Sequence, residues 1–243
     1  MFRFSQIASC GRHKNLLCSP LVEGKEEMNH IVVFDSGYGG ELFADYIEKE
    51  VPILETIRVI DWQQSQQTYQ NPKTARARTL EKLRPYINHT EAIIITNQLV
   101  STTSLEYFRK KYPSQKFSGF SFGQVPKTNA KHALILTTKA MRKTLAYHKF
   151  VYHLKLRSQE FDCDEWIDLI NAGEYMEETV ARDLAQFKKW KPGVIILGDS
   201  HLADVKPILR DFYGPTVAIV DGYKTALKNL CHELGIRGGI GKK

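Results

Sequence analysis

Short runs of aliphatic residues recur along this chain, and they constrain its fold more than any other feature. Each run is continuous rather than alternating, and a segment with helical periodicity follows it. Strands that are buried on both faces need such continuous apolar runs, and helices between them cover those faces. An alternation of buried strands and helices predicts parallel sheets of the α/β class. The runs are Ile31–Phe34, Ala92–Ile95, Ala133–Leu136, Val194–Leu197 and Val217–Val220.

Small polar residues follow each of these runs. They are Asp35-Ser36-Gly37, Thr96-Asn97, Thr137-Thr138, Gly198-Asp199-Ser200 and Asp221-Gly222. Residues of this kind are favoured helix N-caps in any α/β protein, so each one alone indicates only the start of a helix. In open α/β sheets, however, ligands bind beyond the carboxyl ends of the strands, where helix N-termini present free N–H groups. The set as a whole therefore predicts a site for a small anion.

The length of the chain allows two small lobes. It has 243 residues, whereas one domain commonly holds about 100–150. Residues 1–28 have no hydrophobic periodicity and are rich in Ser, Gly and charge, which predicts a flexible N-terminal extension. Met28 is an alternative start of the native protein, which would leave residues 1–27 outside it.

Cysteine usage and hydropathy indicate the compartment. The four cysteines, Cys10, Cys18, Cys163 and Cys231, have neither pairing nor metal-ligand spacing, as in proteins of a reducing compartment. No apolar run approaches the ~20 residues that span a bilayer, and the first residues lack the apolar core of a signal peptide. These features predict a cytoplasmic protein that does not enter the membrane.

The net charge of +7 admits an acidic partner, which can be a small anion, a nucleic acid or an acidic protein. The basic clusters 109–111 and 188–189 fall at the ends of helical patterns, where cations complement the helix dipole. The chain has no basic stripe interleaved with aromatic residues, the arrangement that stacks bases. A small anionic ligand is therefore favoured over nucleic acid.

The polar strand ends form an ordered set of motifs. Residues 31–40 read Ile-Val-Val-Phe-Asp-Ser-Gly-Tyr-Gly-Gly, and Tyr69-Gln70-Asn71, Thr96-Asn97, Thr138, Gly198-Asp199-Ser200-His201 and Val220-Asp221-Gly222 follow in order. The set resembles the glutamate racemases of the aspartate/glutamate racemase superfamily. In that family the corresponding motifs read Phe-Asp-Ser-Gly-x-Gly-Gly, Pro-Tyr-Gly, Cys-Asn-Thr, Gly-Cys-Thr-His and Asp-Ser. The resemblance covers about residues 31–234.

The resemblance implies a fold. It implies two pseudo-symmetric α/β lobes, each with a parallel sheet flanked by helices, and a site in the cleft between them. Residues 29–119 and 212–243 would form the first lobe, and residues 120–211 the second. It also implies a small carboxylate or amino-acid ligand in the context of D-glutamate and the peptidoglycan of the cell wall. No cofactor and no metal are implied, and a homodimer is compatible with the resemblance.

The family's reaction explains which residues matter. Inversion of an α-carbon without a cofactor needs a base on one face and an acid on the other, and the family uses one cysteine from each lobe. In this chain Thr96 and Asp199 stand at these two catalytic positions, while Asp35 and His201, which assist proton transfer in the family, are present. The residues implied to contact the substrate are Ser36, Tyr69, Gln70, Asn97, Gln98, Thr138 and Ser200.

The loss of both thiols excludes the two-thiol mechanism and leaves several hypotheses. A threonine hydroxyl without an activating neighbour is a poor base, and Asp199 is either a base of raised pKa or a helix N-cap. The first hypothesis is a carboxylate or amino-acid binding protein without normal racemase activity. The second is an isomerase or decarboxylase in which Asp199 alone transfers a proton. An interaction role of the basic surface ranks third. We expect the site residues to converge on the cleft between the lobes.

Overall fold

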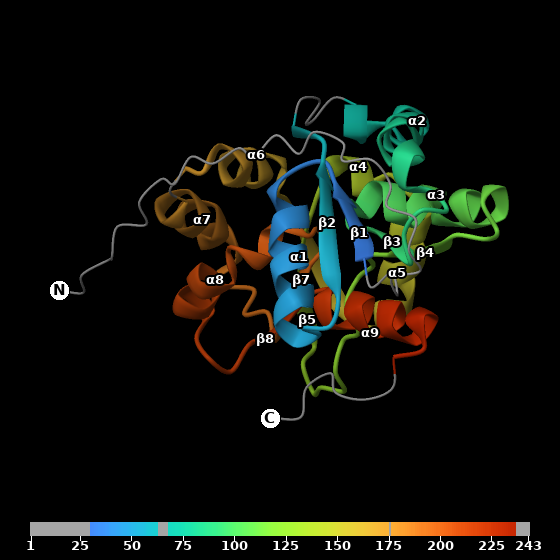
Figure 1. Ribbon diagram of the computed structural model, residues 1–243. Coiled ribbons are helices and arrows are strands. Elements are labelled where there is room, and N and C mark those ends of the chain that lie inside the picture. The colour runs from blue at the N-terminus through green and yellow to red at the C-terminus, as the bar shows by residue number, and fades with distance from the viewer. Residues whose placement is uncertain (1–29, 63–67, 175, 237–243) are drawn as a thin grey trace.

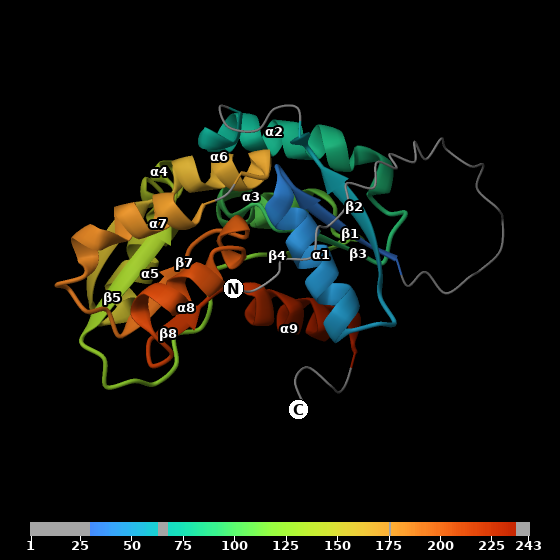
Figure 2. The same ribbon diagram turned by 90° about the vertical axis from the view of Figure 1, so that its left-hand side faces the viewer.

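The computed structural model describes residues 30–62, 68–174 and 176–236. It contains two four-stranded sheets in which every strand is parallel to its neighbour. Each sheet forms the centre of one lobe, and Figure 2 shows β1 to β4 on the right and β5, β7 and β8 on the left. This is the two-lobed α/β fold that the sequence predicts. The predicted extension, residues 1–28, lies outside the described residues.

The two sheets share one topology. The first sheet has the order β2-β1-β3-β4 and the second the order β6-β5-β7-β8, so each strand of one sheet has a counterpart in the other. The strands of the first sheet are β1 (His30–Asp35), β2 (Glu55–Ile60), β3 (Ala92–Ile95) and β4 (Lys116–Gly119). Those of the second are β5 (His132–Thr137), β6 (Arg157–Asp162), β7 (Val194–Leu197) and β8 (Ala218–Val220).

Helices cover both faces of each sheet (Figure 1). In the first lobe α1 (Tyr38–Glu50) and α9 (Tyr223–Leu234) pack on one face, and α2 (Pro72–Leu83) and α3 (Gln98–Lys111) on the other. In the second lobe α6 (Asp164–Ala172), α7 (Glu177–Leu184) and α8 (Lys206–Tyr213) cover one face, and α4 (Lys139–Arg142) and α5 (Leu145–Leu154) the other. Short 3-10 turns span Thr68–Gln70, Arg84–Tyr86, Ala185–Phe187 and His201–Ala203.

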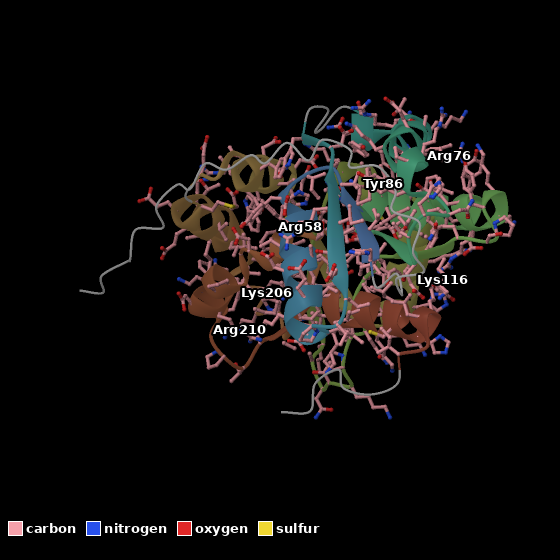
Figure 3. All side chains as sticks on the ribbon, viewed as in Figure 1. Arg58, Arg76, Tyr86, Lys116, Lys206 and Arg210 are labelled. Atoms are coloured by element: carbon pink, nitrogen blue, oxygen red, sulfur yellow. The ribbon has the colours of Figure 1, made fainter. Side chains whose placement is uncertain are left out.

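Burial separates the central strands from the edge strands. All residues of β3 and β7 are buried, and full burial of each such aliphatic side chain contributes about 1.5–3 kcal/mol. The edge strand β2 is only partly buried. Its Arg58, labelled beside α1 in Figure 3, forms ion pairs of 2.9 Å with Glu41 and with Glu48. A charged, paired side chain protects an exposed sheet edge from adding another strand.

The boundary between the lobes differs from the predicted one. We expected residues 212–243 to return to the first lobe, but β8 pairs with β7. Val217 and Ile219 pack against the core of the second lobe, because β7 offers this apolar run an open edge. The return to the first lobe comes only with α9, whose Leu227 and Leu230 lie in the core beneath α1.

Candidate active site between the lobes

A small pocket of about 60 Å³ lies between the two lobes. It forms where the carboxyl ends of β1, β3, β5 and β7 meet, which are the two central strands of each sheet. In each sheet the second strand along the chain pairs with one side of the first strand, and the third strand pairs with the other side. A crevice forms at such a switch point. The first lobe contributes Ser36, Tyr69, Gln70, Asn97 and Leu99, and the second contributes Thr138, Ala140, Asp164, Ile167, Asp199 and His201.

Asp35 lies directly beneath this pocket and is fully buried. Its carboxylate accepts hydrogen bonds from the backbone N–H of Ser36 at 2.7 Å, from the Thr96 hydroxyl at 2.7 Å and from the Ser200 hydroxyl at 2.8 Å. Burial raises the pKa of Asp35, and the nearby charge of His201 opposes this effect. Asp35 therefore joins the strand ends of both lobes, and it does not line the pocket.

Thr96 does not face the pocket either. Its hydroxyl lies 2.9 Å from the carbonyl oxygen of Phe34 and 2.7 Å from Oδ2 of Asp35, and the residue is fully buried. When Asp35 is ionised, both of these oxygens can only accept a hydrogen bond, so both compete for the one hydroxyl proton of Thr96. The structure thus turns Thr96 toward the sheet, although we expected it to line the cleft opposite Asp199.

Asn97 and Ser36 form the polar floor of the pocket on the first lobe. The amide oxygen of Asn97 caps α3 by accepting the N–H of Val100 at 3.0 Å, and its amide nitrogen donates to the Ser36 hydroxyl at 2.8 Å. The hydroxyl proton of Ser36 remains available for a ligand. These two residues lie where the sequence predicts substrate contacts.

Gln98 and Ser200 lie outside the pocket lining. Gln98 is buried, and neither atom of its amide has a hydrogen-bond partner among the described residues. Ser200 is buried on Asp35, and its carbonyl accepts the hydroxyl of Tyr223 at 2.9 Å. We expected both residues to contact the substrate, but both side chains are buried away from the pocket lining.

Asp199 and His201 form a close pair on the second lobe. Oδ1 of Asp199 lies 2.7 Å from Nδ1 of His201 and accepts the backbone N–H of His201 at 3.1 Å. Burial lowers the pKa of His201, but the hydrogen bond and charge of Asp199, with the charge of Asp35, outweigh burial and raise it. The contact with Asp199 therefore favours the protonated form of His201. Nε2 of His201 has no partner among the described residues.

The remaining predicted residues complete the wall. Thr138 caps α4 by accepting the N–H of Met141 at 3.1 Å, which leaves its own proton free. Tyr69 donates its hydroxyl to Asp61 at 3.0 Å, and Asp61 is in turn held by Arg78 at 2.8 Å. Gln70 is exposed beside them. The anchored hydroxyl fixes the ring of Tyr69 against the pocket.

Sequence reasoning missed two acidic residues that shape this site. Asp61 follows β2, an edge strand whose partly polar sequence gave no buried run to mark it. Asp164 lines the pocket from the first residue of α6. Its signal was its place directly after Cys163, at the start of a helical pattern. Neither residue belongs to the motifs that carry the resemblance.

Two glycines of the first motif allow the lobes to approach each other. A Cβ on Gly39 would lie 2.2 Å from Oγ of Ser200, and one on Gly37 would lie 2.4 Å from Oδ1 of Asn171. That same Asn171 oxygen accepts the N–H of Tyr38 at 2.8 Å. Lys206, labelled in Figure 3, adds an ion pair with Asp221 between α8 and the start of α9. The motif thus places α1 directly against the turn that carries Asp199.

The two described cysteines cannot stand in for the absent thiols. Cys163 and Cys231 are both buried, and neither lines the pocket. Burial raises the pKa of both thiols, which disfavours the thiolate that a base requires.

Within residues 30–62, 68–174 and 176–236, no group of three or more His, Cys, Asp or Glu side chains could hold a metal ion. In the same residues, no helix is long and apolar enough to cross a bilayer.

Comparison with known sequences gives local matches. No family model matches the chain. A stretch of 99 residues, 38% of the chain, is 29% identical to glutamate racemase from Listeria monocytogenes serotype 4a (strain HCC23) and covers 37% of that protein. A longer stretch of 138 residues, 53% of the chain, is 25% identical to glutamate racemase from Herpetosiphon aurantiacus and covers 54% of it. The matched part is thus about a third to a half of each relative.

Comparison with solved structures extends over most of the chain. Glutamate racemase from Escherichia coli, in complex with L-glutamate and the activator UDP-MurNAc-Ala, superposes with a TM-score of 0.76 and 19% identity, over 88% of this chain and 86% of that one. Glutamate racemase from Francisella tularensis, in complex with D-glutamate, gives 0.67 and 18%, over 86% and 82%. The chain therefore has the fold of these proteins.

Proposed function

Because the motifs, the local sequence matches and the shared fold support membership of the glutamate/aspartate racemase family, we propose that this chain is a racemase-like amino-acid binding protein. It binds a small carboxylate or amino acid between its lobes and does not carry out two-thiol racemisation. One observation carries the proposal: Asp199 lines the pocket, whereas Thr96 is buried against Asp35.

Uncharged donors in the pocket support carboxylate binding. The hydroxyl protons of Ser36 and Thr138 are free, because the oxygens of these groups act as acceptors for Asn97 and Met141. Both residues line the pocket. Hydroxyl donors at strand ends can hold a carboxylate without the desolvation cost of a buried cation.

Among the described residues of the first lobe that line the pocket, none carries a carboxylate, thiol or imidazole that could remove or donate a proton at the α-carbon. The Thr96 hydroxyl is engaged by Asp35 and Phe34, and Asp35 itself does not reach the pocket. Racemisation needs a partner on each face of the carbon. A ligand in this pocket therefore meets an acid–base group on one face only.

A second candidate function rests on the Asp199–His201 pair. The 2.7 Å contact orients the Asp199 carboxylate, which lines the pocket. A carboxylate held in this way can serve as a one-sided base, as a decarboxylase or an isomerase would require. Whether the protein turns over its ligand is the question that separates the two candidates.

The proposed setting follows from the resemblance. We place the protein in the cytoplasm, where unpaired cysteines stay reduced, and in the context of D-glutamate and peptidoglycan. The structural relatives were solved with L-glutamate and D-glutamate, which makes amino acids the first ligands to test. The expected partner is a small molecule rather than a membrane or a nucleic acid, and a homodimer is compatible with this function.

Proton exchange tests the proposal. Purified protein is incubated with D- or L-glutamate in deuterated water, and α-proton exchange and optical inversion are followed. We expect inversion no faster than a blank, because losing one positioned acid or base commonly costs about 10²–10⁴-fold. Exchange into one enantiomer only, abolished in Asp199→Asn, would favour the one-sided enzyme. Fast racemisation would refute the reading of both positions.

Restoring the thiols provides the complementary test. Thr96→Cys and Asp199→Cys are made singly and together. A thiol is a weaker hydrogen-bond donor than a hydroxyl, so the new side chain at position 96 is held less firmly on Asp35. We expect racemase activity in the double variant and in neither single one. Activity in a single variant would show that a second base is already present.

A further inference from the structure

The charges that line the pocket are unevenly distributed. Besides Tyr69, its titratable side chains are Asp164, Asp199 and His201, and no Lys or Arg is among the described residues that line it. When His201 is protonated, its charge offsets that of the Asp199 carboxylate, which lies 2.7 Å from it. Asp164 then adds an unbalanced negative charge, and the buried carboxylate of Asp35 lies beneath. The pocket is therefore acidic, although the chain as a whole carries +7.

Nearby cations do not neutralise Asp164. Lys139 and Arg142 both pair with Asp162, at 3.0 and 3.4 Å, and neither lines the pocket. Asp164 forms no ion pair with any residue that the structure describes. Burial, and then the charge of Asp162, raise the pKa of Asp164 to about 6, against the opposing charge of Lys139. Its carboxylate is therefore mostly ionised at pH 8.

Few side chains of the described pocket lining can donate to a carboxylate without being acidic themselves. The helix caps take up one N–H at each helix start, that of Val100 by Asn97 in α3 and that of Met141 by Thr138 in α4. The hydroxyls of Ser36 and Thr138 remain as donors. Nε2 of His201, on a residue only 3% exposed, is a further polar atom without a partner among the described residues. A second carboxylate in this pocket would share it with the acidic side chain of Asp164.

The rest of the lining is apolar. Leu99, Ala140 and Ile167 present aliphatic carbon to the pocket, and Leu99 also packs in the core of the second lobe. A surface of this kind accommodates an uncharged side chain and gives a charged one no partner.

We propose that the ligand is an amino acid with a single carboxylate and an uncharged side chain, rather than glutamate or another dicarboxylate. This inference rests on the proposed function and specifies its ligand class. The α-carboxylate binds the hydroxyls of Ser36 and Thr138, and the ammonium group faces the acidic side chains of the second lobe. A side-chain carboxylate is rejected by repulsion from Asp164, which is discrimination by an unfavourable contact.

Isosteric ligand pairs test this inference. Binding of glutamate and glutamine, and of aspartate and asparagine, is measured by calorimetry at pH 8 with both enantiomers of each. The members of a pair differ in charge and hardly in shape. We expect at least one amide to bind about tenfold or more tightly than its acid. In Asp164→Asn the preference should shrink toward unity, whereas Asp168→Asn, on the exposed face of the same helix, should keep it.

The outcomes separate the inference from the proposed function. If glutamate or aspartate binds as tightly as its amide, the inference is overturned while amino-acid binding stands. If no amino acid or small carboxylate binds at all, the proposed function fails and the inference fails with it. Because the ligand pairs are compared on the unmodified protein, the result does not depend on the folding of Asp164→Asn.

Discussion

The ends of β3 and β7 occupy equivalent places in the two lobes, and their side chains behave differently. Each is the third strand of its sheet along the chain and pairs with the first. After β3, the hydroxyl of Thr96 turns to Asp35 and is buried. After β7, Asp199 lines the pocket and pairs with His201. The repeated topology therefore sets the backbone position of each residue. The hydrogen-bond partners nearby determine whether its side chain points into the pocket.

The difference originates at the first strand of each sheet. β1 ends in Asp35, whose buried carboxylate accepts hydrogen bonds from the hydroxyl of Thr96 in the first lobe and from that of Ser200 in the second. β5, the counterpart of β1, ends in Thr137, whose hydroxyl lies 3.4 Å from the carbonyl of Gly198. The second lobe has no buried carboxylate of its own at this place, so nothing draws Asp199 away from the pocket.

The first prediction contrasts the two aspartates, and its expected effect is the largest. Asp35→Ala should lower the free energy of unfolding by about 3 kcal/mol, because it leaves several buried donors without an acceptor. Asp199→Ala should cost about 1 kcal/mol or less, since it removes one pair at the edge of a pocket. Urea denaturation of both variants measures the difference. Equal losses would mean that Asp199 is as structural as Asp35.

The sequence predicts the central strands because burial on both faces leaves a clear mark. β1, β3, β5 and β7 are continuous aliphatic runs, and each one was recognised. The edge strand β8 also falls in such a run, Val217–Val220. The edge strands β2, β4 and β6 do not, because their sequences mix polar and apolar residues. The same limit hid Asp61, which directly follows β2.

The site could be predicted as far as its backbone positions but not its side-chain directions. The polar strand ends identify Ser36, Asn97, Thr138 and Asp199, which all line the pocket. The same reasoning gives Thr96 and Ser200, and the resemblance gives Gln98, but these three side chains do not line the pocket. A motif specifies position along the strand, whereas direction depends on contacts with Asp35 and with the opposite lobe.

A second prediction compares the aspartates that follow the edge strands. Asp61 directly follows β2 and Asp162 is the last residue of β6, and each binds two cations. The side chain of Asp61 is fully buried, whereas that of Asp162 is 23% exposed. Asp61→Asn should therefore cost about 2 kcal/mol, and Asp162→Asn about 0.5 kcal/mol or less.

The effect of pH provides the control for this pair. Burial tends to raise the pKa of Asp61, but hydrogen bonds from Arg78, Tyr69 and Lys82 outweigh it, and the net shift is downward. A carboxyl with a lowered pKa stabilises the fold above its unfolded value of about 4, and this contribution is lost as pH falls. The difference between Asp61→Asn and the parent should close below about pH 4. A difference independent of pH would contradict the ionic origin.

A third prediction concerns the pair that His201 forms with Asp199 in the second lobe. His201→Gln should lower the free energy of unfolding by about 1 kcal/mol at pH 6, because it removes a charged hydrogen bond to Asp199. Since the pKa of His201 is raised on folding, the stabilisation is complete below about pH 6.5 and declines as pH rises through the folded value. Denaturation at pH 6 and pH 9 checks this. His148→Gln, an exposed histidine, should change little at either pH.

The last prediction concerns Gln98, which stands two residues after Thr96 as His201 stands two residues after Asp199. Both amide atoms of Gln98 are buried without a hydrogen-bond partner among the described residues, and an unpaired buried amide is costly. Gln98→Met should therefore leave the stability unchanged or raise it by up to about 1 kcal/mol. Gln115 is the matched control, because it is buried as well. Its amide accepts the N–H of Asn88 at 2.6 Å and donates to Thr90 at 3.2 Å, so Gln115→Met should be destabilising.

Ligand affinity should not change in Gln98→Met, since Gln98 does not line the pocket. Loss of binding at unchanged stability would restore the substrate contact that the family motif implies for Gln98, and would mean that this side chain turns into the pocket when a ligand is bound.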